Sequence, residues 1–419
     1  MIDLDELKKS PRRWGLMLLL VASMAVCYAQ RGAMSVAAPL AMKELGLSTA
    51  TVGVLLSAFF WVYAFMQVPA GWLVDRIGPR GAYAYGYLLG SVAFGLTGFF
   101  TALIPLITLR VMMGAGQSVI FPASARAVAD CFEDKERGTV TAAYLVGVRI
   151  GQALIGYLAA TLLTTYGWRA FFIVCGAVPL VWLLPWLRFW GNVERPPTAQ
   201  PSVAADPAHR QPSFVRSLGL LRERTVLGIF LGFFAYDYAW FVYISWLPGY
   251  LVLERHFSVH EMAIYSSVPY VAMLVVILLS GWLSDRLVAR GFPETRVRKA
   301  FILTGLAMGC LVVPAGLVED HITAVWLLIV ALCGLGVATP NTWTLTQAVC
   351  EKRVVGTVSG IQNCGGNLGG ILAPLVTGYI AYVTGSFVLA LSLTGAILLC
   401  GIAAYTFLIS RHVGIRQVT

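Results

Sequence analysis

The stretch GWLVDRIGPRG covers residues 71–81, and the similar stretch GWLSDRLVARG covers residues 281–291, about 210 residues later. A second pair, GTV at 138–140 and GTV at 356–358, repeats at nearly the same distance. Two repeats at nearly one offset indicate a chain built from two related halves. In membrane proteins, parallel repeats related by an axis along the membrane normal place a substrate site between the halves, near the middle of the bilayer.

The composition identifies the setting in which these repeats fold. Hydrophobic residues make up 58% of the 419 residues and charged residues 12%, against about 45–50% and about 25% in soluble domains. Apolar runs of about 20 residues recur along the chain, and runs that cross a bilayer must be helical to satisfy their backbone. We therefore expect an all-α membrane protein of twelve transmembrane helices in two pseudo-symmetric six-helix bundles. The predicted spans are 14–38, 51–74, 82–101, 104–128, 139–164, 168–190, 225–250, 263–284, 300–318, 322–348, 355–382 and 386–410.

The net charge of +10 reflects topology rather than a nucleic-acid partner. By position, roughly 22 of the 30 Lys and Arg residues fall in the N-terminus, the C-terminus and alternate loops on one side of the predicted bilayer. Cytoplasmic loops carry this excess, so both termini are expected in the cytoplasm of a multi-pass inner-membrane protein.

The chain has a break in its apolar pattern at residues 191–224, which are rich in Pro and Ala. This segment is predicted to be a cytoplasmic linker between an N-terminal bundle, 1–190, and a C-terminal bundle, 225–419. The Cys residues form no CxxC pair and the five His residues lie in loops or tails. No metal site, cofactor, catalytic nucleophile or phosphate-binding loop is predicted, so an enzyme is not expected.

The repeated loop resembles the signature loop of the major facilitator superfamily. The matching pattern is Gly71-x-x-x-Asp75-Arg76-x-Gly78-x-Arg80, and its copy contains Asp285 and Arg286. The two Asp residues are expected either to cap helix ends or to pair with nearby Arg and so hold one conformational state. The candidate gating residues are Asp75, Arg76, Arg80, Arg126, Asp285 and Arg286.

Within that superfamily, several spans resemble the anion:cation symporter family. The segments are CYAQRGAMSVAAP at 27–39, FPASARAV at 121–128 and NCGGNLGGILAPLVTGY at 363–379. The resemblance implies a monomer that carries sugar acids, hexuronates, tartrate, phthalate or similar organic anions, often with protons. It also implies that Arg31 binds the substrate carboxylate, a task for which the planar guanidinium is suited. The alternative is a structural Arg31 that helix carbonyls satisfy.

Two further membrane arginines need an explanation, because a charge at mid-membrane costs about 2.5–3.5 kcal/mol on insertion scales. Arg149 is interpreted either as an additional cation of the substrate cavity or as part of a structural ion pair. Arg110, near the start of the fourth span, is interpreted as interfacial or structural.

Acidic residues are scarce in the predicted spans. Only Asp237 lies near a span centre, about 18 Å from residue 225 at 1.5 Å per residue. Proton-coupled members of the family carry acids where this chain has Gln30 and Gln117, which do not titrate. Either Asp237 carries the coupling proton, or transport is uncoupled or exchange-driven and Asp237 is a fixed partner of Arg31 or Arg149.

Other polar and aromatic residues are candidates for contacts with the substrate. Tyr28 lies one helical turn from Arg31, and Tyr63 and Gln67 lie one turn apart on the second span. Aromatic packing and interhelical hydrogen bonds, at about 0.6 kcal/mol each, are the alternative interpretation. The candidate substrate-binding residues are Arg31, Tyr28, Tyr63, Gln67, Asn363, Arg149, Tyr236 and Trp343.

These observations favour secondary transport of a small organic anion by alternating access, with proton symport as the preferred mode. Uncoupled or exchange transport of the same anions is the first alternative. Efflux of a cationic or amphipathic compound, with Asp237 as its partner, is the second. A sensor that kept the fold and lost turnover is the third.

Overall fold

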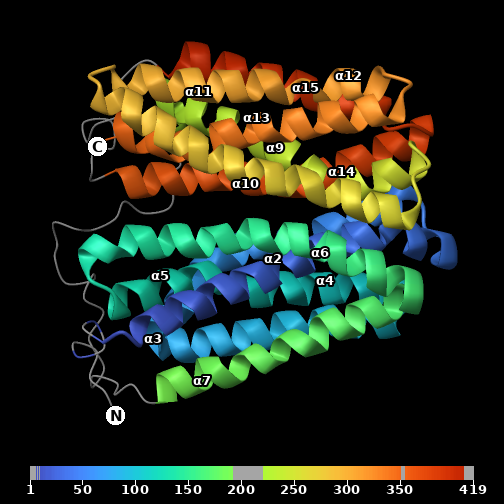
Figure 1. The fold of residues 1–419 in the computed structure, drawn as a ribbon, viewed down its shortest axis with the longest axis horizontal. Helices are drawn as coiled ribbons and strands as arrows, with labels where there is room; N and C mark the ends of the chain where they lie inside the picture. The colour runs from blue at the N-terminus through green and yellow to red at the C-terminus, as the bar shows by residue number, and fades with distance from the viewer. Residues whose placement is uncertain (1–5, 7, 9, 192–219, 351–353, 410–419) are drawn as a thin grey trace. The chain divides into compact units, whose positions relative to one another are not determined.

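The computed structural model describes residues 6, 8, 10–191, 220–350 and 354–409, and nearly all of them are helical (Figure 1). The chain divides into two compact units. Unit 1 falls within Met1–Leu47, Ala58–Arg210 and Val259–Ser267, and unit 2 within Ser48–Ser57, Gln211–Ser258 and Val268–Thr419. Most of the predicted linker, from 192 to 219, lies outside the described residues, so the linker boundaries stay a prediction.

The N-terminal part of the chain forms long helices joined by short 3-10 turns. In chain order they are α2 (Arg13–Leu45), α3 (Thr49–Leu96), η1 (Thr97–Phe99), α4 (Leu103–Gln117), α5 (Ile120–Cys131), α6 (Asp134–Ala177), η2 (Val178–Trp182) and α7 (Leu183–Gly191).

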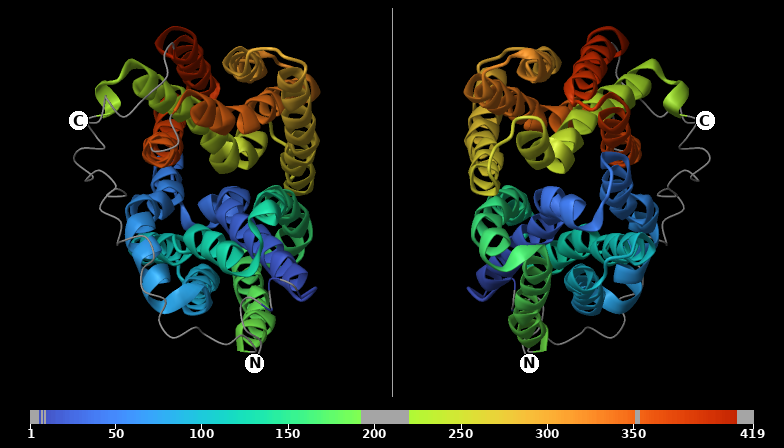
Figure 2. Two further views of the ribbon diagram at one scale, coloured as in Figure 1. Left: turned by 90° about the vertical axis from the view of Figure 1, so that its left-hand side faces the viewer. Right: turned by 90° about the vertical axis from the view of Figure 1, so that its right-hand side faces the viewer.

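The C-terminal part repeats this helical character. Its elements are η4 (Leu220–Arg222), α9 (Arg224–Leu253), α10 (Val259–Ala289), α11 (Glu294–Gly309), α12 (Val312–Leu317), α13 (His321–Val349), α14 (Val355–Thr384), α15 (Val388–Ala403) and the π-helical turn η5 (Ala404–Leu408). Figure 2 views the helices of each unit nearly end-on.

Two glycines break the longest helices. Gly78 in α3 has φ 79° and Gly167 in α6 has φ 78°, a left-handed region that glycine enters without steric cost. The predicted spans 51–74 and 82–101 lie on either side of Gly78, and 139–164 and 168–190 on either side of Gly167. Each glycine thus marks a turn between two predicted spans.

Ten stretches of the described residues are long and apolar enough to cross a membrane. This number is lower than the twelve predicted because Thr139–Gly191 forms one stretch across Gly167 and the part of α3 after Gly78 is not among the ten. The predicted spans 104–128 and 300–318 are instead each divided into two helices, α4 with α5 and α11 with α12. The predicted all-α membrane architecture is confirmed.

Glycines bring the helices of unit 1 close together. An added Cβ at Gly151 of α6 would lie 2.0 Å from the carbonyl oxygen of Ala25 on α2. One at Gly114 of α4 would lie 2.2 Å from the carbonyl oxygen of Phe59 on α3. Because small residues permit such backbone contact, α2 runs directly beside α6, as Figure 1 shows.

Unit 2 is organised around α9. This helix packs along α14 and α15 and also contacts α13. An added Cβ at Gly369 of α14 would lie 2.8 Å from the backbone nitrogen of Tyr238 on α9. The tight α9–α14 contact places the middle of α9, with Asp237, against the glycine-rich part of α14.

Candidate functional site

Arg31 lies among three aromatic rings in unit 1. Its Cζ is 4.4 Å from the ring centroid of Tyr28, 4.9 Å from that of Phe59 and 4.5 Å from that of Tyr63. Tyr28 shares the α2 face of Arg31, as the one-turn spacing predicts. Phe59 and Tyr63 stack on each other on α3, with centroids 5.2 Å apart. Rings attract the guanidinium through their faces, while its N–H groups remain directed outward in its own plane.

Two hydrogen-bonded glutamine amides, Gln117 and Gln30, support the Arg31 side chain. The Arg31 Nε donates to Gln117 Oε1 at 2.8 Å, and the Gln117 Nε2 donates to Gln30 Oε1 at 3.2 Å. Gln30 Nε2 in turn donates to Ser91 Oγ and to the carbonyl oxygen of Cys175, both at 3.2 Å. The network joins α2, α4, α3 and α6. The two glutamines singled out in the sequence are therefore neighbours that bond to each other and to Arg31.

These partners leave the charge of Arg31 uncompensated within unit 1. In the described part of this unit, the side chains around Arg31 are an amide, a phenylalanine, a thiol (Cys27) and two tyrosines, of which Tyr63 also hydrogen-bonds to the guanidinium. Gln30 and Gln117 are 2% and 1% exposed, whereas Arg31 is partly exposed. A cation that is desolvated and held by neutral groups is a suitable receptor for a carboxylate, which supplies the missing charge.

The other two membrane arginines differ from Arg31 in their surroundings. Arg110 is 3% exposed, so its side chain lies inside unit 1, which favours the structural interpretation. Its Nη1 contacts the Met113 sulfur at 3.7 Å, and its buried Nε has no hydrogen-bond partner among the described residues. Arg149 donates to Gln152 Oε1 at 3.4 Å. Neither arginine is among the contacts of Arg31 in the described residues of unit 1.

An aromatic cluster in unit 2 brings together two of the predicted residues. Phe233 stacks on Tyr236 with ring centroids 5.5 Å apart and meets Trp343 edge-on at 5.1 Å. The Tyr236 hydroxyl shares a hydrogen bond of 2.6 Å with Thr339 Oγ1. Tyr236 is 4% exposed and Trp343 36% exposed, so Trp343 is the more accessible of the two. Phe233, which connects them, was not predicted.

The Asp237 side chain packs against α14 at Gly366, where that helix has no side chain. An added Cβ at Gly366 of α14 would lie 2.0 Å from Asp237 Oδ2, so the carboxylate rests where that helix has no side chain. Asp237 itself is partly buried. The predicted ion pair of Asp237 with Arg31 or Arg149 joins residues of different units and stays a prediction.

The remaining polar candidates fall into different settings. Asn363 is partly buried on α14, and its neighbour Gln362 is fully buried and accepts a 2.6 Å hydrogen bond from Thr346 Oγ1. Gln362 thus links α14 to α13, a role that the sequence did not suggest. The side chains of Gln67 and Asp75 lie outside the described part of the structure.

The two copies of the signature loop share one local contact. Arg76 lies over the Trp72 ring at 5.2 Å, and Arg286 lies over the Trp282 ring at 5.1 Å. Both pairs are exposed and four residues apart, the spacing at which helical side chains meet. In the first copy, the carbonyl oxygen of Arg80 also accepts a 3.1 Å hydrogen bond from the Trp186 indole.

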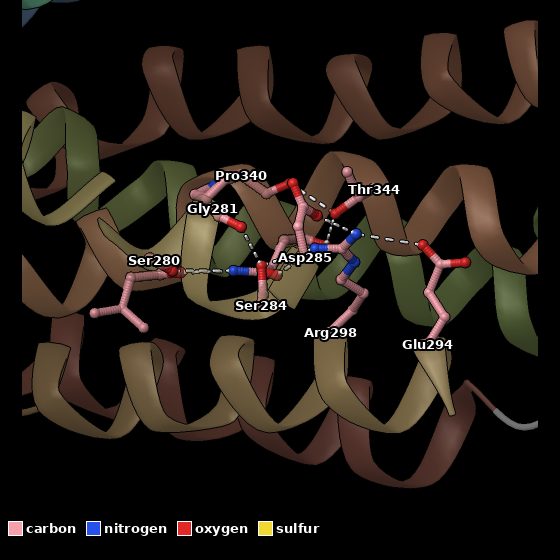
Figure 3. A network of polar contacts seen from close by, with 10 residues as sticks. Ser280, Gly281, Ser284, Asp285, Glu294, Arg298, Pro340 and Thr344 are labelled. Atoms are coloured by element: carbon pink, nitrogen blue, oxygen red, sulfur yellow. Dashed lines mark hydrogen bonds and ion pairs between the residues drawn. The ribbon is translucent and has the colours of Figure 1, made fainter. Parts of the chain in front are cut away.

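The second copy is anchored by a buried arginine, Arg298 of α11 (Figure 3). Its Nη2 pairs with Asp285 Oδ1 at 2.7 Å and Glu294 Oε1 at 3.4 Å, and its Nη1 donates to Ser284 Oγ at 2.7 Å. Of the two interpretations of Asp285, the structure thus shows pairing with an arginine. Asn341 of α13 joins this group, at 3.5 Å from Arg298 Nη1, and donates to Ser280 Oγ at 3.1 Å.

Arg126 has a local partner as well. Its Nε bonds to Asp130 Oδ1 at 3.0 Å, one turn further along α5, and 40% of its side chain is exposed. Such exposed helical pairs contribute only about 0.3–0.5 kcal/mol. Its gating role stays a prediction.

Comparison with known proteins places this chain among transporters. The chain is 30% identical to a D-galactonate transporter of Escherichia coli strain CFT073, over 97% of this chain and 98% of that protein. It is 31% identical to a probable galactarate/D-glucarate transporter of Escherichia coli strain K12, over 97% and 96%. It is also 31% identical to a probable sulfoacetate transporter of Cupriavidus necator, over 91% and 90%. These relatives confirm the resemblance to organic-anion transporters.

Solved structures support the same fold. A bacterial homologue of the human lysosomal transporter Spinster, in an inward-facing and occupied conformation, matches with a TM-score of 0.77 at 21% identity, over 97% of this chain and 98% of that chain. The nucleoside transporter NupG matches with a TM-score of 0.76 at 12% identity, over 94% and 100%. The family model described as Major Facilitator Superfamily matches residues 19–374. The chain is therefore a membrane transporter rather than an enzyme, and it belongs to the major facilitator superfamily.

Proposed function

We propose that the protein moves small organic anions of the sugar-acid class across the cell's inner membrane by alternating access. The observation that carries this proposal is Arg31, a partly exposed cation held by three rings and an uncharged amide network. The curated relatives that cover nearly the whole chain are named for galactonate, galactarate and glucarate, which supports the same substrate class.

Arg31 is the proposed receptor for the substrate carboxylate. Its Nε is bonded to Gln117, and Tyr63 also hydrogen-bonds to the guanidinium, so we assign its remaining N–H groups to the contact with the substrate carboxylate. The proposal assigns contacts with substrate hydroxyls to Tyr28 and Tyr63, whose rings lie against the guanidinium. The proposal assigns further contacts to Gln67, Arg149, Tyr236, Trp343 and Asn363.

Proton symport is the proposed energy source, with Asp237 as the group that binds the proton. Asp237 is a partly buried acid on α9, and Gly366 leaves space beside its carboxylate. A carboxyl in such a place gains or loses its charge as the surrounding helices move, because burial disfavours the charged form. The proposal also includes a cytoplasmic location for both termini and a monomeric protein.

Uptake into proteoliposomes tests the proposal. Labelled D-galactonate and D-glucarate should enter vesicles that contain the protein, and an inward proton gradient should raise the level they reach. Efflux of amphipathic cations without anion uptake would overturn the proposal in favour of a drug exporter. A sugar acid that stabilises the protein against heat without being transported would overturn it in favour of a sensor.

The Asp237→Asn variant tests the coupling step separately. We expect it to lose gradient-driven accumulation and to retain exchange of labelled for unlabelled anion, because the amide cannot carry a proton. Accumulation equal to that of the wild type would show that Asp237 is a structural residue.

A further inference from the structure

The amides behind Arg31 form a chain with one direction. Each member donates to the next, from Arg31 Nε to Gln117 Oε1, then from Gln117 Nε2 to Gln30 Oε1, and from Gln30 Nε2 to Ser91 and the Cys175 carbonyl. Each glutamine thus accepts a hydrogen bond through its amide oxygen and donates through its amide nitrogen. Both glutamines are buried, so each unmade hydrogen bond would be costly. A carboxylate at either position could accept from one neighbour but could not donate to the other.

We propose that the Arg31 site binds its organic anion without taking up a proton. The reason is that the guanidinium is held by the side-chain amides of Gln117 and Gln30, which do not titrate. This inference rests on the proposed function. It means that the coupling proton binds at a site other than Arg31, which receives the substrate carboxylate. Gln117 and Gln30 act as positioning residues, since they contact Arg31 or each other rather than the substrate.

The charge balance at Arg31 explains why the amide matters. A Glu side chain at 117 would place a carboxylate oxygen at the position of Gln117 Oε1, 2.8 Å from Arg31 Nε. A charge-assisted pair of that length competes with the substrate carboxylate for the same guanidinium. The substrate would then bind well only after the glutamate had taken up a proton. The amide accepts the same hydrogen bond and leaves the full positive charge for the substrate.

The other titratable groups near Arg31 in the described part of unit 1 are a thiol and two phenols. Cys27 and Tyr28 approach Arg31 from α2 and Tyr63 from α3. The neighbouring helices α4 and α6 carry the cations Arg110 and Arg149. Within the described part of unit 1, Arg31 therefore has no carboxyl or imidazole neighbour, the side-chain types that ordinarily titrate nearest to neutral pH.

Anion affinity in a background without Asp237 provides the test. The full-length Asp237→Asn protein is titrated with D-galactonate by calorimetry at about pH 5.5, 6.5 and 7.5, where the probe stays ionised. We expect its Kd to change by less than about twofold across this range. In the Asp237→Asn, Gln117→Glu double variant, we expect a Kd weakened by about tenfold or more at the highest pH and recovering at the lowest. A steep pH dependence in the first protein, or none in the second, would overturn the inference.

A matched variant separates charge from packing. Gln117→Met in the same background removes the hydrogen bonds and adds no titratable group, so its Kd should be weaker than that of the parent and equally flat with pH. If the Met and Glu variants show the same pH profile, Gln117 is only a structural residue and the inference fails.

Failure of the proposed function would appear differently. If no protein binds D-galactonate or D-glucarate at any pH, the proposed function fails, and melting temperature then tests the inference alone. The difference in melting temperature between Gln117→Glu and wild type should vary between about pH 5.5 and about pH 7.5, because the new acid titrates against Arg31. A difference that stays constant would contradict the inference.

Discussion

At the scale of single residues, the site combines what the sequence predicted with what only packing creates. Arg31 was predicted because a cation inside an apolar span is conspicuous, and Tyr28 because it lies one turn away. The bond between Gln30 and Gln117 was not predicted, since 87 residues separate them and their contact depends on how α2 meets α4. Phe59 gave no signal at all, because a phenylalanine in a membrane span usually only packs.

Gly366 provides a prediction at this scale. A Gly366→Ala substitution places a Cβ 2.0 Å from Asp237 Oδ2 and 2.9 Å from Phe233 Cε1, so the carboxylate and the ring must move. Because small misplacements of a working group cost as much as about 100-fold in rate, we expect gradient-driven accumulation of labelled D-galactonate to fall by about tenfold or more.

Gly360→Ala is the control on the same helix, since an added Cβ there meets nothing within 4 Å. It should accumulate the anion as the wild type does. Equal accumulation by the Gly366→Ala and Gly360→Ala variants would show that the space at Gly366 beside Asp237 has no part in coupling.

At the scale of helices, hydropathy predicted the apolar spans well and their breaks poorly. Gly78 and Gly167 turn the chain inside what are otherwise continuous helices, and an apolar run does not reveal whether its glycines adopt a positive φ. Arg298 was also missed. Its place at the start of a span suggests a residue at the membrane surface, yet α10 and α13 bury it and surround it with polar partners.

The Arg298 cluster leads to a prediction of stability. Replacing Arg298 by Ala leaves Ser284 and Asn341 without a buried donor and Asp285 without its partner. Since 69% of the Asp285 side chain is exposed, solvent screens that ion pair, and the loss comes mainly from the buried groups. We expect the free energy of unfolding to fall by roughly 1–3 kcal/mol, measured as a lower melting temperature in detergent.

Arg296 lies on the same helix and is exposed, so Arg296→Ala serves as the control and should melt close to the wild type. If Arg298→Ala melts at the same temperature as that control, the cluster in Figure 3 does not stabilise the α10–α11–α13 contact.

At the scale of the whole molecule, the duplicated loop was sufficient to predict the superfamily, and the comparisons confirm it. The two loop copies even repeat the same Trp–Arg contact. Substrate and coupling could not be predicted in the same way. They depend on a few side chains, such as Gln117 and Asp237, whose replacement leaves the helices and their repeats unchanged. For that reason the fold follows from the sequence pattern, while the anion and its energy source require experiments on those residues.

The central claim is that Arg31 receives the carboxylate of a transported anion. Counterflow of labelled D-galactonate into proteoliposomes tests it most directly, with wild type, Arg31→Lys, Arg31→Ala and the exposed-residue control Arg188→Ala compared at equal protein content. Truncating one partner of a buried charge pair costs about 2–5 kcal/mol. We therefore predict that the initial rate of Arg31→Ala is lower than that of the wild type by about 30-fold or more. Arg31→Lys should also be impaired, because an ammonium lacks the paired donors of the guanidinium. Arg188→Ala should transport at the wild-type rate. An Arg31→Ala protein that is folded and transports D-galactonate at the wild-type rate would contradict the claim.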